Sequence, residues 1–189
     1  MTQKKYVLGI DPGKLGAMAI IDIDTKLLQE IIMIPVTSEN DIDVKELYTT
    51  FQNILIKYGE LCSAVVEDVH AIHGASAGST FSFGYSVGVI HALLKCLEIP
   101  MILDQPKTWQ ALLWKGLDEI RGPSKFDKNG KEHRGKLDTK AMSLLGSKRI
   151  YPNAKLTDPR SERAKKENHN ISDAIQIAAY GVELFHNSQ

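Results

Sequence analysis

The order of short apolar runs limits the folds open to this 189-residue chain. Three runs typical of buried strands come first, at residues 6–11, 16–22 and 27–35, and the short turn between the last two fits an antiparallel hairpin. Helix-type patterns at residues 43–59 and 81–97 then alternate with strand-type patterns at 63–68 and 99–103. Three more helix-type patterns follow, from residue 106 onward, from 138 onward and at 171–185. This order predicts a single mixed-sheet α/β domain over residues 1–189.

Composition places the chain among ordinary globular proteins. A chain of this length buries enough surface to fold without disulfides or a structural metal. Cys62 and Cys96 stand in apolar settings without CxxC spacing, so we expect reduced core cysteines of a cytosolic protein. No uncharged apolar stretch reaches about 18 residues, and no signal-peptide core follows the polar start. We therefore expect no membrane association, and a location in the cytoplasm, of a host if the source is viral, or in an organelle interior.

The charge is unevenly distributed although its sum is zero. Residues 1–100 carry 7 Lys and no Arg against 12 acids, whereas residues 101–189 carry 16 Lys and Arg against 11 acids. A basic half is typical of a protein that meets a polyanion, although a solvated surface gives the same count. The segment 116–137 is rich in Gly and basic residues, which predicts a mobile basic insertion.

Three acids occupy positions where an open α/β sheet usually builds its site. Asp11 ends the first apolar run at a Pro-Gly turn, Glu67 follows the short apolar run at residues 64–66, and Asp173 opens the last helix. Each has a simpler interpretation, as a turn residue, a solvated strand end or a helix N-cap. His169 lies four residues before Asp173, and the two share a face if the helix already includes Asn170.

Oxygen-rich ligand sets of this kind suit Mg²⁺ or Mn²⁺ better than zinc. Two such ions about 4 Å apart activate a water and stabilise the leaving oxygen of a phosphoryl displacement. Without metal the carboxylates repel one another, so at least one should have a raised pKa. The pattern points to phosphodiester hydrolysis.

Five motifs lie in a defined order along nearly the whole chain. They are Gly9–Gly13 with Gly16, Val66–His70, Ser79–Gly84 with Gly88, Pro106–Trp109, and His169–Ala174. In this order they resemble the RuvC-like Holliday-junction resolvases, nearest to the phage and plant-chloroplast branch. The resemblance implies an RNase H-like fold, with a mixed five-stranded sheet flanked by helices. It also implies a homodimer that nicks two strands of a four-way DNA junction symmetrically, with two Mg²⁺ ions per active site and Mn²⁺ as a substitute.

The resemblance also implies roles for individual residues. Asp11, Glu67 and Asp173 match the family's catalytic metal ligands, and His169 matches the fourth, although three-residue spacing would select Asn170 instead. The chain departs from many relatives in having His70 in place of an aromatic residue, and Gln110 in place of a lysine. The residues expected to contact DNA are His70, Phe81, Lys107, Lys125, Lys128, Lys131, Arg134, Lys136 and Lys140.

Some alternatives stay open at this stage. Phe81 and Phe83 are either core packing or stacking residues, and Trp109 and Trp114 are expected to pack helices. The helix with Gly84 and Gly88 is a candidate dimer surface. A broader branched-DNA nuclease, an actin-like or sugar-kinase ATPase and a non-catalytic junction-binding protein are the competing functions. The ATPase would need a second Gly-rich phosphate loop, which the sequence lacks.

Overall fold

The computed structural model of this chain describes residues 5–59, 61–68, 76–161 and 163–187. Within these ranges a five-stranded sheet has the order β3-β2-β1-β4-β5. Its strands are β1 (Tyr6–Ile10), β2 (Ala17–Asp22), β3 (Leu28–Met33), β4 (Ser63–Glu67) and β5 (Met101–Asp104). β1, β2 and β3 pair antiparallel, whereas β1, β4 and β5 pair parallel. The predicted mixed-sheet α/β fold is confirmed.

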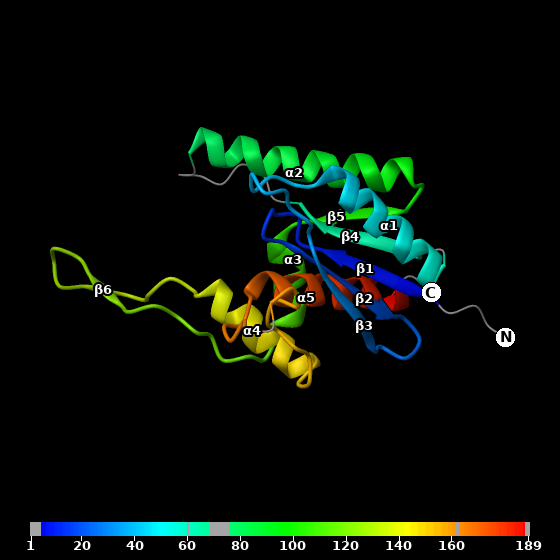
Figure 1. Ribbon diagram of the computed structural model, residues 1–189. Coiled ribbons are helices and arrows are strands. Elements are labelled where there is room, and N and C mark those ends of the chain that lie inside the picture. Colours follow the sequence, from blue (N-terminus) through cyan, green and yellow to red (C-terminus); the bar gives the residue numbers. More distant parts are fainter. Residues whose placement is uncertain (1–4, 60, 69–75, 162, 188–189) are drawn as a thin grey trace.

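Helices cover both faces of the sheet (Figure 1). The helices are α1 (Val44–Tyr58), α2 (Ala77–Cys96), α3 (Pro106–Leu113), α4 (Thr139–Ile150) and α5 (His169–Asn187). Alternate residues of a strand point to opposite faces, so Val7 joins the core under α5 and Leu8 joins the core under α1 and α2. Because both faces are covered, the inner strands are buried along their whole length, which explains their continuous apolar sequences.

Helix α5 lies directly on β1. A Cβ atom on Gly9 would come within 2.2 Å of the backbone nitrogen of Ala178, so only glycine allows this approach. The contact fixes α5 across the sheet with its first turn close to the end of β1. In this way the fold brings the start of α5 next to the end of β1, although the two are far apart in the sequence.

Between α3 and α4 the chain forms a thin arm that extends away from the body (Figure 1). Its two short strands, β6 (Lys125–Phe126) and β7 (Glu132–His133), pair antiparallel. Asp127 closes the turn by accepting hydrogen bonds from the backbone nitrogens of Asn129 (2.8 Å) and Lys131 (3.0 Å). The predicted insertion 116–137 therefore contains a β-hairpin, and its mobility stays a prediction.

The structure corrects several expectations about α2. The helical spacing of Tyr85, Val89, Leu93 and Cys96 predicts that they share one face of α2, but the fully buried residues of this helix are Ser86, Ile90 and Leu94. Cys96 is exposed and Cys62 is half-buried, so the prediction of two core cysteines is wrong. Phe81 is 79% exposed, and core packing is therefore wrong for it as well.

The face of α2 that carries Gly84 and Gly88 is open among the described residues. Cβ atoms built on Gly84 and Gly88 would meet nothing within 4 Å. The close helix approach expected at these glycines is therefore not made by any described part of this chain. None of the described helices is long and apolar enough to span a membrane.

Candidate active site

The three predicted acids lie at the end of the sheet where the parallel strands finish. Asp11 directly follows β1 and Glu67 is the last residue of β4, its parallel neighbour. Asp173 lies in the first turns of α5, the helix that crosses β1. Neighbouring parallel strands end at one sheet edge, and the position of α5 adds a third acid there.

The turn after β1 holds Asp11 in place. Its backbone nitrogen donates to the carbonyl of Ala17 (3.0 Å), and the nitrogen of Gly16 donates to Gly13 (2.8 Å). A Cβ atom on Gly16 would lie 2.0 Å from the Asp11 carbonyl oxygen. The turn is thus too tight for any other residue at position 16, which is the physical reason for the glycine in the first motif.

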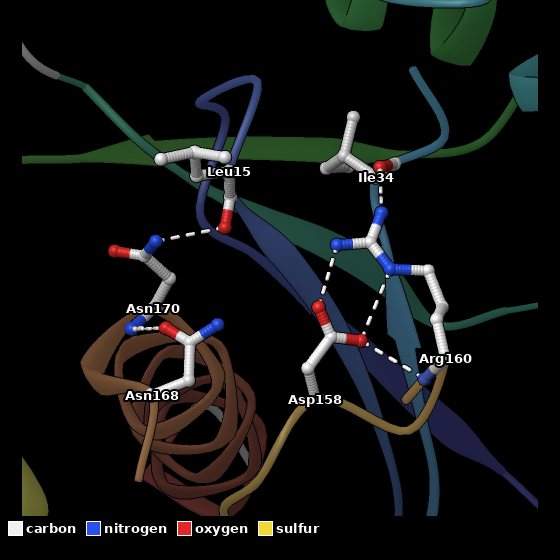
Figure 2. Close-up of polar contacts among 6 residues, drawn as sticks. All are labelled: Leu15, Ile34, Asp158, Arg160, Asn168 and Asn170. Atoms are coloured by element: carbon white, nitrogen blue, oxygen red, sulfur yellow. Dashed lines mark hydrogen bonds and ion pairs between the residues drawn. The ribbon is translucent and has the colours of Figure 1, made fainter. Parts of the chain in front are cut away.

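A second contact joins this turn to the start of α5, as Figure 2 shows. The Asn170 side chain donates to the carbonyl of Leu15 (2.7 Å), and the Asn170 backbone nitrogen donates to the side chain of Asn168 (3.0 Å). Asn168 thereby caps the helix, and Asn170 holds the turn that carries Asp11. Nearby, Arg160 forms two hydrogen bonds with the Asp158 carboxylate, of 3.0 and 2.7 Å, and donates to Ile34.

The acids influence one another's ionisation. Burial, followed by the charges of Asp173 and Glu67, raises the pKa of Asp11 well above its ordinary 3.8, and the Gly13 backbone N–H opposes this only in part. Burial and the Asp173 charge raise the pKa of Glu67 to about 7. Burial also raises the pKa of Asp173 to about 6, although Ser143 and Lys140 lower it. The three carboxylates therefore share one electrostatic environment.

Two neighbouring cavities open onto this group. One, of about 520 Å³, is lined by Glu67, Asp173 and His169 among others. The other, of about 660 Å³, is lined by Asp11 and again by His169. His169 thus lies between the two, and burial together with the charges of Lys140 and Lys166 lowers its pKa. A neutral imidazole at pH 7 is the form that binds a cation.

Among the described residues, no set of three or more His, Cys, Asp or Glu side chains is arranged to hold a metal ion as it stands. The donor chemistry nevertheless fits a hard divalent cation: three carboxylates, each destabilised as an anion, with a neutral imidazole beside them. Divalent cations would remove the electrostatic cost that raises these pKa values.

Other polar residues at this edge have structural partners. Asp104 ends β5 beside Glu67, but its carboxylate accepts the Tyr180 hydroxyl at 2.5 Å. Asp68 lines the first cavity next to Glu67. Trp109 is buried as expected, and its indole partly lowers the pKa of Glu67.

The sequence analysis missed a buried polar chain beneath Asp173. Ser143 of α4 donates from its hydroxyl to Asp173 Oδ1 at 2.6 Å. Gln176 Nε2 donates to the same hydroxyl oxygen at 3.0 Å, and Gln176 Oε1 accepts from the indole nitrogen of Trp114 at 2.8 Å. Ser143 and Gln176 are 1% and 0% exposed. The only signal in the sequence was two polar residues among apolar ones in helical segments.

The structure divides the predicted DNA-contacting residues into three groups. Lys107 and Lys140 are exposed and line the cavity that holds Glu67 and Asp173. Phe81 is exposed near the start of α2, and His70 lies outside the described residues. The remaining five are exposed on the arm, away from the cavities: Lys125, Lys128, Lys131, Arg134 and Lys136.

A mixed sheet of this strand order, flanked by helices and with an acid at the end of its first strand, defines an RNase H-like fold. The solved structures that share the fold of this chain include two of RuvC. One is Thermus thermophilus RuvC in complex with Holliday junction substrate: it is 14% identical, with a TM-score of 0.58, over 97% of this chain and 95% of that one. The other is Thermus thermophilus RuvC, 15% identical, with a TM-score of 0.58, over 96% of both chains. No protein-family model and no curated protein sequence matches the chain.

Proposed function

We propose that this protein is a metal-dependent endonuclease that resolves four-way DNA junctions by paired, symmetric nicks. The observation that carries the proposal is the convergence of Asp11, Glu67 and Asp173 in one electrostatic environment, with pKa values raised by burial and mutual repulsion. The similarity to RuvC, one structure of which contains a Holliday junction substrate, supports DNA as the substrate.

Two Mg²⁺ or Mn²⁺ ions held at these acids would activate the attacking water and stabilise the leaving oxygen. Asp11 lies in the tight turn, and the charges of both other acids raise its pKa, so its carboxylate is well placed to approach both ions. Glu67 and Asp173 would each hold one. His169 takes the fourth position, because it lines both cavities whereas the Asn170 amide is engaged with Leu15.

The positive charges near the site suit a phosphodiester. Lys140 lies close enough to lower the pKa of both His169 and Asp173, and with Lys107 it lines the same cavity. The negatively charged phosphate would lie between these lysines and the ions, and cleavage would leave 5′-phosphate and 3′-hydroxyl ends. The arm places more lysines far from the cavity, where they would contact phosphates without reading sequence.

Paired nicks require two active sites, and the outward face of α2 supports a homodimer. Phe81 and Tyr85 are 79% and 46% exposed there, beside Gly84 and Gly88, where an added Cβ would meet no described atom within 4 Å. A second copy would bury these rings and use the glycines for close approach. Sedimentation of the parent and of Gly88→Glu tests this: we expect a dimer and a monomer, and a monomeric parent would contradict it.

The test of activity is digestion of an end-labelled four-way junction with Mg²⁺, beside a linear duplex and a flap of matched sequence. We expect nicks at symmetric positions on opposite strands of the junction and little cutting of the duplex. Equal cutting of junction and flap would indicate a broader branched-DNA nuclease. Binding without cutting in the parent would contradict the proposed chemistry.

A further inference from the structure

We propose that Ser143 is a positioning residue for the metal site, held by Gln176 and Trp114 so that its hydroxyl hydrogen is directed at Asp173. The inference rests on the proposed function, because it assigns Asp173 a metal. It concerns residues that do not touch substrate or metal themselves, and it starts from the orientation of three hydrogen bonds in the interface between α4 and α5.

The donor and acceptor roles in this series of hydrogen bonds are fixed from its Trp114 end. The Trp114 indole nitrogen can only donate, so the Gln176 atom 2.8 Å away must be the amide oxygen. This orientation leaves the Gln176 amide nitrogen facing α4, where it lies 2.9 Å from the Ser143 carbonyl and 3.0 Å from the Ser143 hydroxyl oxygen. A neutral amide nitrogen also can only donate.

The Ser143 hydroxyl oxygen must therefore accept from Gln176, and its single hydrogen is free for Asp173. The 2.6 Å contact with Asp173 Oδ1 is the length of a strong hydrogen bond to a carboxylate. Oδ1 thereby accepts one hydrogen bond from the protein side, so Oδ2 is the oxygen that we expect to bind a cation. The chain sets both the rotamer of Asp173 and which oxygen faces the cavity.

Burial makes this arrangement costly to change. Ser143 is 1% exposed and Gln176 is 0% exposed, so water cannot replace a lost partner easily. Trp114 also contacts Trp109 edge to face, with ring centroids 5.9 Å apart. One packed layer formed by α3, α4 and α5 thus lies beneath Asp173.

The same helix offers a matched control. Ser147 lies one turn after Ser143, is also fully buried, and also donates to α5, but to the backbone carbonyl of Ser172 (3.0 Å) rather than to a site carboxylate. Loss of either hydroxyl should weaken the helix interface to a similar degree. Only loss of the Ser143 hydroxyl should affect the metal site.

The experiment is a calorimetric titration of Mn²⁺ into the full chain, for the parent and for Ser143→Ala, Ser143→Thr and Ser147→Ala, with thermal melts of each. We expect Ser143→Ala to bind Mn²⁺ about tenfold more weakly, the size of effect typical of groups that orient metal ligands. Ser143→Thr, which keeps the hydroxyl, should bind within about threefold of the parent, and Ser147→Ala should bind like the parent. In junction digests Ser143→Ala should lower kcat and leave KM unchanged.

Several results would overturn the inference. They are Mn²⁺ binding by Ser143→Ala within twofold of the parent, equal losses in Ser143→Ala and Ser147→Ala, and a folded Ser143→Thr as weak as the alanine variant. If Ser143→Ala does not fold, Trp114→Phe decides the question. A weaker Mn²⁺ affinity of this variant supports the role of the Trp114–Gln176–Ser143 hydrogen bonds, and an unchanged affinity refutes it. A parent that binds Mn²⁺ but cuts no junction contradicts the proposed function and leaves this inference standing.

Discussion

Replacing Glu67 with glutamine should stabilise the metal-free protein at alkaline pH while it removes a metal ligand. Burial and Asp173 raise the pKa of Glu67 from its ordinary 4.5 to about 7. The folded protein therefore binds this proton more tightly than the unfolded chain does. The free energy of unfolding of the metal-free parent should fall as pH rises from about 4.5, and the loss should be complete above about pH 7.

The size of the effect follows from the difference between the ordinary and the raised pKa of Glu67. A difference between 4.5 and about 7 corresponds to about 3 kcal/mol at alkaline pH. Glu67 is only half-buried, and the free energy of ionising it is shared in part with Asp173. We therefore expect Glu67→Gln to raise the free energy of unfolding by about 2 kcal/mol at pH 8. For a chain of this length this corresponds to a rise in Tm of roughly 4–8 °C.

The assay is urea unfolding in EDTA between pH 4.5 and 8.5, with Glu98→Gln as a control because Glu98 is an exposed acid at the end of α2. The Glu67→Gln gain should be near zero at pH 4.5, grow up to about pH 7 and then stay constant, whereas the control should show no such trend. Added Mg²⁺ should stabilise the parent and have much less effect on Glu67→Gln. A variant that is less stable than the parent at pH 8, or a gain independent of pH, would refute the electrostatic reasoning.

Three further outcomes follow from the structure. Asp11→Asn should lower junction cleavage at least a thousandfold in single-turnover digests and leave junction affinity within about threefold; cleavage at the parent's rate would contradict its assignment. Replacing Lys125, Lys128 and Lys131 together with glutamine should reduce the slope of log affinity against log salt by up to about 3, measured by fluorescence anisotropy, if each lysine contacts a phosphate. An unchanged slope would exclude the arm from the DNA interface. Gly9→Ala should prevent folding, because its Cβ would meet the α5 backbone at 2.2 Å, and a soluble variant with the parent's melting curve would show that the helix contact is wrong.

The elements that sequence patterns predicted well are those whose signals are local. The strands were predictable because β1, β2 and β4 are buried on both faces and therefore continuously apolar. An aspartate directly before a helical pattern predicts an N-cap at Asp43 and at Asp138. Both are confirmed, since each side chain accepts a hydrogen bond from a backbone nitrogen three residues on, at 3.0 Å. A cap is formed within one turn of chain and needs no tertiary contact.

The buried face of α2 could not be predicted because the apolar pattern of this helix is weak. Glycine, serine and alanine occur all around this helix, and the buried side includes Ser86, whose hydroxyl bonds to the carbonyl of Ser82 within the helix. Core packing was one of the two alternatives for Phe81, because large aromatic rings usually lie in the core, but Phe81 and Tyr85 are 79% and 46% exposed. On α2 they lie on the outward face, which another molecule can cover.

Sequence reasoning found the acids and missed the residue that orients one of them. Asp11 and Glu67 follow recognisable apolar runs and Asp173 precedes one, so each has a local signal. Ser143 and Gln176 have only a weak signal, as polar residues among apolar ones, because a serine and a glutamine within helices are usually exposed. Their role depends on α4 and α5 meeting at one register, which only the tertiary structure reveals.

Anomalous diffraction from crystals grown with Mn²⁺ would test most directly whether the three acids form a metal centre. We predict two peaks about 4 Å apart, one in contact with Asp11 and Glu67 and the other with Asp11 and Asp173, and His169 beside them. Crystals of Asp11→Asn should lose at least one peak. Well-ordered carboxylates with no peak between them at millimolar Mn²⁺ would contradict the account.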